Sequence, residues 1–185
     1  MRRTRRAGAL LSILLPLAAA SFAGAPARAA EPAEVHASAG RFNVLNRDPL
    51  PEAGWEVSFA PRRFHWLPRC PRCPRWLRWP PELAPAVGGR ATSDGALYAY
   101  AGFRFDVPLG GAWRFTPQWA TGLYYYPPGG HSLGGLVEFR SGVELSRRIG
   151  SGGRVGLLFY HLSNAGFYER NPGSESLVLT YTARP

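Results

Sequence analysis

Three polar residues near the end of the sequence have the types and spacing that ester hydrolysis requires. His161 and Ser163 are two residues apart, so on a β-strand their side chains point to the same face. Glu175 follows after a turn. A hairpin that pairs Glu175 with His161 has its midpoint at Tyr168, and Ser163 then lies on the same face as both residues. A serine hydroxyl becomes a nucleophile when a histidine takes its proton and an acid orients the histidine. The pattern therefore predicts a Ser-His-Glu triad on one hairpin.

The face that carries these three residues is otherwise apolar. On the two strands of the hairpin it also holds Leu157, Phe159, Leu177, Leu179 and Tyr181. The opposite face of the last strand is polar except for Val178, with Ser174, Ser176, Thr180 and Thr182. Apolar outside and polar inside is typical of a membrane β-barrel, whereas a soluble sandwich or lipocalin-like barrel has the faces exchanged. We expect the membrane barrel, and a triad that faces the bilayer indicates a lipid ester as substrate.

The composition favours an all-β chain. Of its 185 residues, 45% are hydrophobic, 13% aromatic and only 18% charged, whereas a disordered chain is rich in charge and poor in aromatic residues. The 22 glycines and 18 prolines are unfavourable inside helices, which argues against a helical bundle. Short strands joined by turns fit these numbers, and the length suits one domain.

Segments that resemble strands dominate the second half of the chain. Between Gly and Pro clusters, five of them lie at 96–107, 113–126, 133–148, 154–163 and 175–182. Earlier strands are expected at 54–60 and 41–46. Consecutive strands with short turns predict an antiparallel meander. Aromatic residues assigned to strand ends predict the interfacial girdles of a membrane barrel: Trp113, Trp119, Tyr124, Tyr125 and Tyr126.

The N-terminus carries an export signal. Residues 1–29 combine an arginine-rich start, an apolar run and an A-x-A-like site, as secretory signal peptides do. Cleavage after Ala29 leaves a domain of residues 30–185 and removes five arginines from a formal net charge of +10. The remaining charge gives little support to nucleic-acid binding, and none is expected. An uncleaved membrane anchor is the alternative, although the apolar run is short for a span.

Residues 61–90 interrupt the strand pattern with a segment rich in Pro, Arg and Trp. The proline density argues against a central strand or a helix, so we expect a loop or plug-like insertion outside the barrel wall, or a basic surface that touches lipid phosphates. Cys70 and Cys73 lie within it. A lone C-x-x-C lacks the four ligands of a zinc site, and export favours a local disulfide. No metal and no cofactor are expected.

The stretch FYHLSNAGFYERNPGSESLVLTY resembles the signature of the lipid A 3-O-deacylase (PagL) family, acyloxyacyl hydrolase-like outer-membrane enzymes. Its core is His161-Leu162-Ser163-Asn164-Ala165, followed by Asn171-Pro172-Gly173 and Glu175. The similarity covers about residues 91–182. Asn171-Pro172-Gly173 also suits a hairpin turn, and we expect Asn171 to brace the site.

The resemblance implies an antiparallel eight-stranded outer-membrane β-barrel whose active site lies on the outer wall, within the outer leaflet. It makes Ser163 the nucleophile, His161 the general base, and Glu175 the acid that orients the histidine. Asn164 and the backbone amide of Gly166 would form the oxyanion hole, which stabilises the charge of the tetrahedral intermediate.

The function implied by the resemblance is hydrolysis of the 3-O-linked acyl chain of lipid A. Lipopolysaccharide would be the substrate, in the outer membrane of a Gram-negative type of cell. Two alternatives stay open: an esterase that acts on another lipid, and a non-catalytic barrel that binds lipopolysaccharide. The sequence also leaves open whether the barrel is a monomer or a homodimer.

Overall fold

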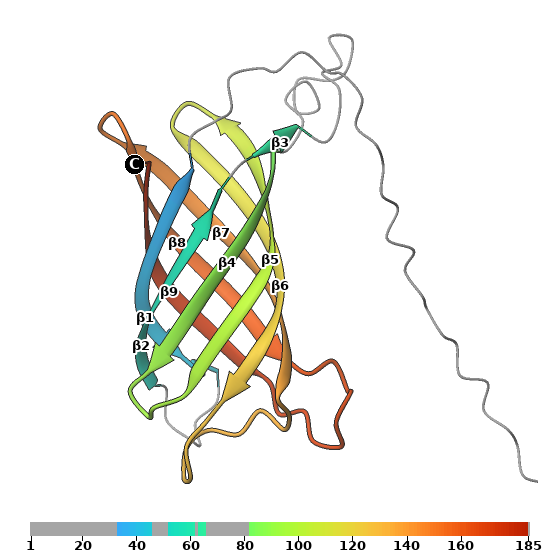
Figure 1. The fold of residues 1–185 in the computed structure, drawn as a ribbon. Coiled ribbons are helices and arrows are strands. Elements are labelled where there is room, and N and C mark those ends of the chain that lie inside the picture. The colour runs from blue at the N-terminus through green and yellow to red at the C-terminus, as the bar shows by residue number, and fades with distance from the viewer. Residues whose placement is uncertain (1–32, 46–51, 62, 66–81, 185) are drawn as a thin grey trace, which may run out of the picture.

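The computed structural model describes residues 33–45, 52–61, 63–65 and 82–184, which form a closed antiparallel β-barrel (Figure 1). Its eight long strands are β1 (Glu34–Phe42), β2 (Glu52–Ala60), β4 (Glu82–Thr92), β5 (Leu97–Gly110), β6 (Trp113–Tyr125), β7 (Val137–Ile149), β8 (Gly153–Ser163) and β9 (Ser174–Ala183). A further strand, β3 (Phe64–His65), is two residues long. The eight-stranded antiparallel fold is confirmed. The described residues include no helix long and apolar enough to cross a membrane.

The barrel closes between its first and last strands. β1 pairs with β2 and with β9, and β2 pairs in turn with β4. The seam between β1 and β9 reaches the pair of Arg41 and Leu177. Just beyond it, the backbone N–H of Val44 donates to the carbonyl oxygen of Glu175 at 2.8 Å. The start of β9 is therefore held by β8 on one side and by the chain that leaves β1 on the other.

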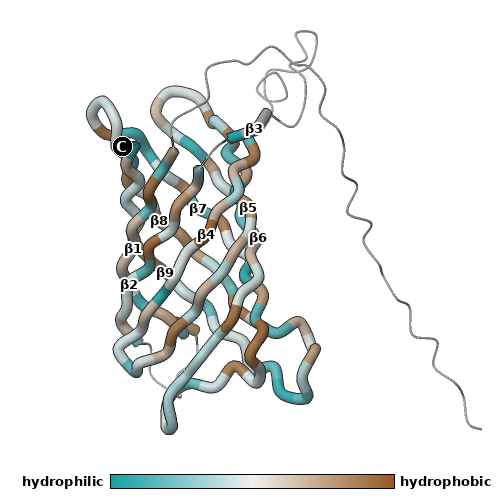
Figure 2. Tube along the Cα trace, viewed as in Figure 1, coloured by the Kyte–Doolittle hydropathy of each residue, from teal (hydrophilic) through white to brown (hydrophobic). Residues whose placement is uncertain are grey.

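Alternate side chains of each strand face opposite sides of the wall. Along β9 the four Ser and Thr residues are buried inside the barrel, whereas Leu177, Leu179 and Tyr181 are exposed on its outside. Figure 2 shows hydrophobic and hydrophilic residues alternating along the strands. The polar interior is confirmed, and the faces are those of an outer-membrane barrel rather than a lipocalin-like one. Such an apolar exterior suits hydrocarbon better than water.

Several charged side chains in the interior form ion pairs and hydrogen bonds across the barrel. Arg140 donates to Glu56 at 2.8 Å, and the hydroxyls of Tyr100 and Tyr160 donate to the same carboxylate. A buried charge without a partner is strongly unfavourable. These contacts therefore fix which strands face each other across the barrel.

The predicted N-terminal strand at 41–46 is wrong. β1 occupies Glu34–Phe42 instead, and it ends before Asn43, whose φ is 58°. That left-handed backbone conformation turns the chain away from the sheet, and Asn tolerates it better than most residues. The prediction missed most of β1 because the four residues in its middle, 37–40, are small and carry little hydropathy contrast.

Part of the predicted insertion at 61–90 belongs to the wall, because β4 starts at Glu82. β4 contains Pro85, which has no backbone N–H to donate to a neighbouring strand. On one side of β4, β2 pairs with residues from Val87 onward and β3 pairs with Glu82 and Leu83. Pro85 lies between these two pairings, so no strand is paired with it on that side. Residues 66–81, with Cys70 and Cys73, and the predicted signal peptide lie outside the described residues, so their predictions stay untested.

The predicted aromatic girdles are correct only in part. Trp113 and Tyr125 are exposed at the two ends of β6. Tyr124 instead points into the barrel and donates its hydroxyl to the carbonyl of His131 at 2.8 Å. Trp119 is exposed but lies midway along β6.

Candidate active site

The candidate site lies on the outer face of the hairpin formed by β8 and β9. His161 and Glu175 are directly paired across the two strands. His161 Nδ1 and Glu175 Oε1 are 2.9 Å apart, within hydrogen-bond distance. The imidazole is 42% exposed and the carboxylate 22% exposed, so the pair is open to the outside of the barrel. This is the register that the sequence predicts.

Ser163 ends β8 on the same face, two residues after His161, and is paired with Phe139 of β7. Because Nδ1 of His161 is engaged with Glu175, Nε2 is the nitrogen left to act on the serine hydroxyl. No hydrogen bond joins Ser163 to His161 among the described residues. Catalytic hydrogen bonds are often long without substrate and tighten when it binds.

Gly173 makes room for the histidine. A Cβ at this position would lie 2.8 Å from Cε1 and 3.5 Å from Nε2 of His161. Its φ of +69° is also one that favours glycine. Both the positive φ and the nearby imidazole of His161 therefore favour glycine at position 173.

The two residues expected to bind an oxyanion have their donors engaged within the loop. Asn164 is fully buried, and its amide nitrogen donates to the carbonyls of Leu133 at 3.1 Å and Arg170 at 2.7 Å. Its side-chain oxygen accepts the N–H of Gly166 at 3.0 Å. These groups could reach an oxyanion only if one of these bonds is exchanged, so their role as oxyanion donors stays a prediction.

Asn171 is within reach of the same turn. Its side-chain oxygen accepts the backbone N–H of Asn164 at 3.0 Å, next to Ser163 in the chain. This contact is in keeping with the bracing role expected for Asn171. It ties the two ends of the β8–β9 loop together where the nucleophile emerges from the sheet.

The loop at 126–136 packs against this turn, which the sequence did not predict. Leu133 is fully buried, and the hydroxyl of Tyr168 accepts the N–H of Val137 at 3.3 Å. A Cβ on Gly134 would lie 1.9 Å from the carbonyl oxygen of Arg170. The predicted strand at 133–148 is therefore wrong over its first four residues, because no periodicity distinguishes them from the strand that follows.

Asp94, in the β4–β5 turn, binds the middle of the same loop. Its carboxylate accepts the backbone N–H of His131 and that of Ala96, each at 3.2 Å, and the hydroxyl of Thr92. Burial raises the pKa of Asp94, but these hydrogen bonds outweigh burial and hold the pKa below its usual value.

An apolar groove runs along the outer wall beside the candidate triad. It has a volume of about 610 Å³ and includes Leu157, Phe159, Leu177 and Leu179. Phe159 and Leu177 are paired across the strands, next along the face from His161 and Glu175. A long acyl chain would fit such a surface, with its ester at the polar end. Within the described residues, no group of three or more His, Cys, Asp or Glu side chains is placed to hold a metal ion.

Comparison with known proteins agrees with this geometry. Residues 109–184 match the lipid A 3-O-deacylase (PagL) family. The matched region holds β6 to β9 and all the candidate site residues, and the resemblance read from the sequence is confirmed. No curated protein matches the sequence significantly.

Two solved structures with the barrel fold are similar to this chain. The crystal structure of the outer membrane enzyme PagL shares 17% identity with a TM-score of 0.56, and the match covers 82% of this chain and 99% of that one. The crystal structure of Neisserial surface protein A shares 12% identity with a TM-score of 0.52, over 85% and 100% of the two chains. At these identities the likeness establishes the fold.

Proposed function

We propose that the protein is an outer-membrane serine esterase that removes the 3-O-linked acyl chain of lipid A. The observation that carries the proposal is the outward-facing pair of His161 and Glu175, at 2.9 Å, with Ser163 on the same face beside an apolar groove. The match to the lipid A 3-O-deacylase family supplies the substrate class.

The two ends of the barrel support an outer-leaflet site. The candidate triad lies at the end that carries the connections after β6 and β8 (Figure 1). The opposite end carries the short turns after β5 and β7, and also the connection of residues 61–81 between β2 and β4. Membrane barrels have short periplasmic turns and longer extracellular loops. The loops after β6 and β8 therefore support an extracellular position for the candidate site, where lipopolysaccharide would reach it laterally.

The chemistry follows from the donors and acceptors of the triad. The oxygen of Ser163 attacks the ester carbonyl while Nε2 of His161 takes its proton, and the carboxylate of Glu175 stabilises the resulting imidazolium through Nδ1–H. The tetrahedral intermediate collapses, the sugar hydroxyl leaves with the proton from His161, and the acyl group stays on Ser163.

Water completes the reaction. His161 takes a proton from a water molecule, the hydroxide attacks the acyl-serine, and a free fatty acid leaves as Ser163 recovers its proton. The imidazole is exposed, so water can approach it at the membrane interface. An oxyanion donor contributes about 100–1000-fold in rate in a known protease, which is the role proposed for Asn164 and Gly166 after exchange of a loop hydrogen bond.

Mass spectrometry of lipid A tests the proposal. Cells that express the protein should lose one ester-linked acyl chain, and tandem fragmentation should assign it to the 3-O position. Ser151→Ala, in the exposed turn after β7, should retain this activity, whereas Ser163→Ala should lack it. Loss of a different acyl chain would point to another lipid esterase, and unchanged lipid A would favour a barrel that only binds lipopolysaccharide.

A further inference from the structure

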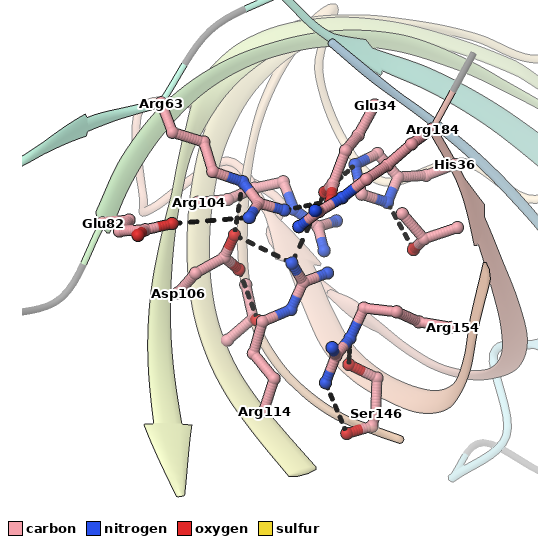
Figure 3. A network of polar contacts seen from close by, with 12 residues as sticks. Glu34, His36, Arg63, Glu82, Arg104, Asp106, Arg114, Ser146, Arg154 and Arg184 are labelled. Carbon is pink, nitrogen blue, oxygen red and sulfur yellow. Dashed lines mark hydrogen bonds and ion pairs between the residues drawn. The ribbon is translucent and has the colours of Figure 1, made fainter. Parts of the chain in front are cut away.

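A second polar site lies inside the barrel, at the end opposite the candidate triad. A cavity of about 210 Å³ opens there, beside the turns that precede β6 and β8 (Figure 3). Its lining includes five arginines: Arg63, Arg114, Arg148, Arg154 and Arg184. The lining differs from the acyl groove in being mostly polar and strongly basic, although Pro108, Ala112 and Trp113 also contribute to it.

Three carboxylates neutralise only part of this charge. Glu82 and Asp106 line the cavity, and Glu34 contacts its arginines. Arg63 pairs with all three of these acids, and Arg114 pairs with Glu34 and Asp106. Five guanidinium groups thus face three carboxylates.

Arg154 is the buried arginine of the five that forms no ion pair with these acids. It is only 7% exposed, and its guanidinium donates to the hydroxyl and carbonyl of Ser146 and to the carbonyl of Ala112 at 2.9–3.2 Å. No carboxylate among the described residues forms a salt bridge with it. The charged groups that act on it are two arginines, Arg114 and Arg148, and two acids, Asp106 and Glu34. A bound anion would offset the desolvation of this buried cation.

Arg114 adds donors to the same cavity. Its Nη1 contacts Asp106 and Glu34, but its Nε and Nη2 are buried without a hydrogen-bond partner among the described residues. Arginine presents a planar fork of N–H donors that matches the oxygens of phosphate. Two buried arginines with unused donor capacity, beside an exposed Arg148, make a cradle for one tetrahedral oxyanion.

We propose that this mouth of the barrel binds a phosphate group, independently of the esterase site. The group could be inorganic phosphate or the phosphomonoester of a lipid headgroup at the adjacent membrane surface, because both offer the same oxygens. The cavity volume exceeds that of a phosphate ion, and its open side admits a group that remains attached to a larger molecule. A bound phosphate would neutralise the charge of Arg154 on β8. It would also contact Arg114 on β6 and so connect the two strands.

Calorimetric titration of the refolded, full-length barrel with inorganic phosphate tests this site. The protein is held in a non-ionic detergent at constant ionic strength. We expect saturable binding at one site, weakened at least tenfold by Arg154→Gln and also weakened by Arg148→Gln. Arg148 is exposed, so its substitution leaves the packing intact. Arg147→Gln is the matched control, because Arg147 is exposed on the outer wall and does not line the cavity, so its substitution should leave binding unchanged.

The affinity for inorganic phosphate, measured in two kinds of vesicle, then distinguishes a lipid headgroup from free phosphate as the natural ligand. If a headgroup is the natural ligand, adding phosphatidic acid to phosphatidylcholine vesicles should weaken the binding of inorganic phosphate, and Arg154→Gln should abolish that difference. Equal affinity in both vesicles would assign the site to free phosphate. The proposal is overturned if wild-type protein shows no saturable binding, or if both arginine variants bind as tightly as Arg147→Gln.

Discussion

Gly173 offers a sharp test of the candidate site, because Gly173→Ala acts on the imidazole without changing a chemical group of the triad. The added Cβ would lie 2.8 Å from Cε1 of His161, whereas ordinary contact starts at 3.4 Å, so the ring must move by roughly 0.6 Å. In a reactive geometry, a misplacement of about 1 Å can cost about 100-fold in rate. We therefore expect turnover to fall about 10- to 100-fold.

The substitution also strains the backbone, which a control must separate from the displaced ring. Alanine at a φ of +69° costs about 1–2 kcal/mol of stability. Gly129 has a φ of +83°, and a Cβ added there would have no heavy atom within 4 Å, so Gly129→Ala carries the strain without the contact. Both variants should lose similar unfolding free energy in urea, measured in phosphatidylcholine vesicles.

The assay is release of fatty acid from purified lipopolysaccharide in detergent micelles, with kcat and KM determined separately. Gly173→Ala should lower kcat, and Gly129→Ala should not. If the two variants turn over substrate within twofold of each other, His161 does not act from the position seen over Gly173. The assignment of the general base would then have to be abandoned.

Three further substitutions test other parts of the reasoning. Ser163→Ala should abolish acyl release while the barrel stays folded, as heat-modifiable migration on gels will reveal; an unchanged rate would exclude Ser163 as the nucleophile. Glu175→Ala should slow turnover strongly without stopping it, by up to the ~10⁴-fold seen when the acid of a serine protease is neutralised, and a full rate would refute the orienting role. Leu179→Arg, on the outer wall, should lower the unfolding free energy in vesicles by about 2–4 kcal/mol if it lies near the bilayer midplane. Ser151→Arg in the aqueous turn should change it by less than about 0.5 kcal/mol, and equal effects would mean that β9 does not face lipid.

The hairpin register was predictable because side-chain alternation is strict. Once His161 is opposite Glu175, parity alone assigns Ser163 and Leu177 to the outer face, and the structure has this register. β4 was not predictable, because Pro85 breaks the usual strand pattern and only the gap between β2 and β3 makes it tolerable. The bonds of Asn164 were also out of reach, since they join loops whose relative position depends on the closed barrel.

The seam between β1 and β9 couples the candidate chemistry to the completion of assembly. Glu175 lies on β9, and its backbone carbonyl accepts the N–H of Val44, which follows β1. Contacts between such distant parts of a chain form late, because a long loop must close first. The backbone bond between Val44 and Glu175 therefore forms only when the barrel closes, whereas the hairpin that pairs His161 with Glu175 is local. If the candidate site needs both contacts, acyl release measured over time would report barrel closure in the membrane.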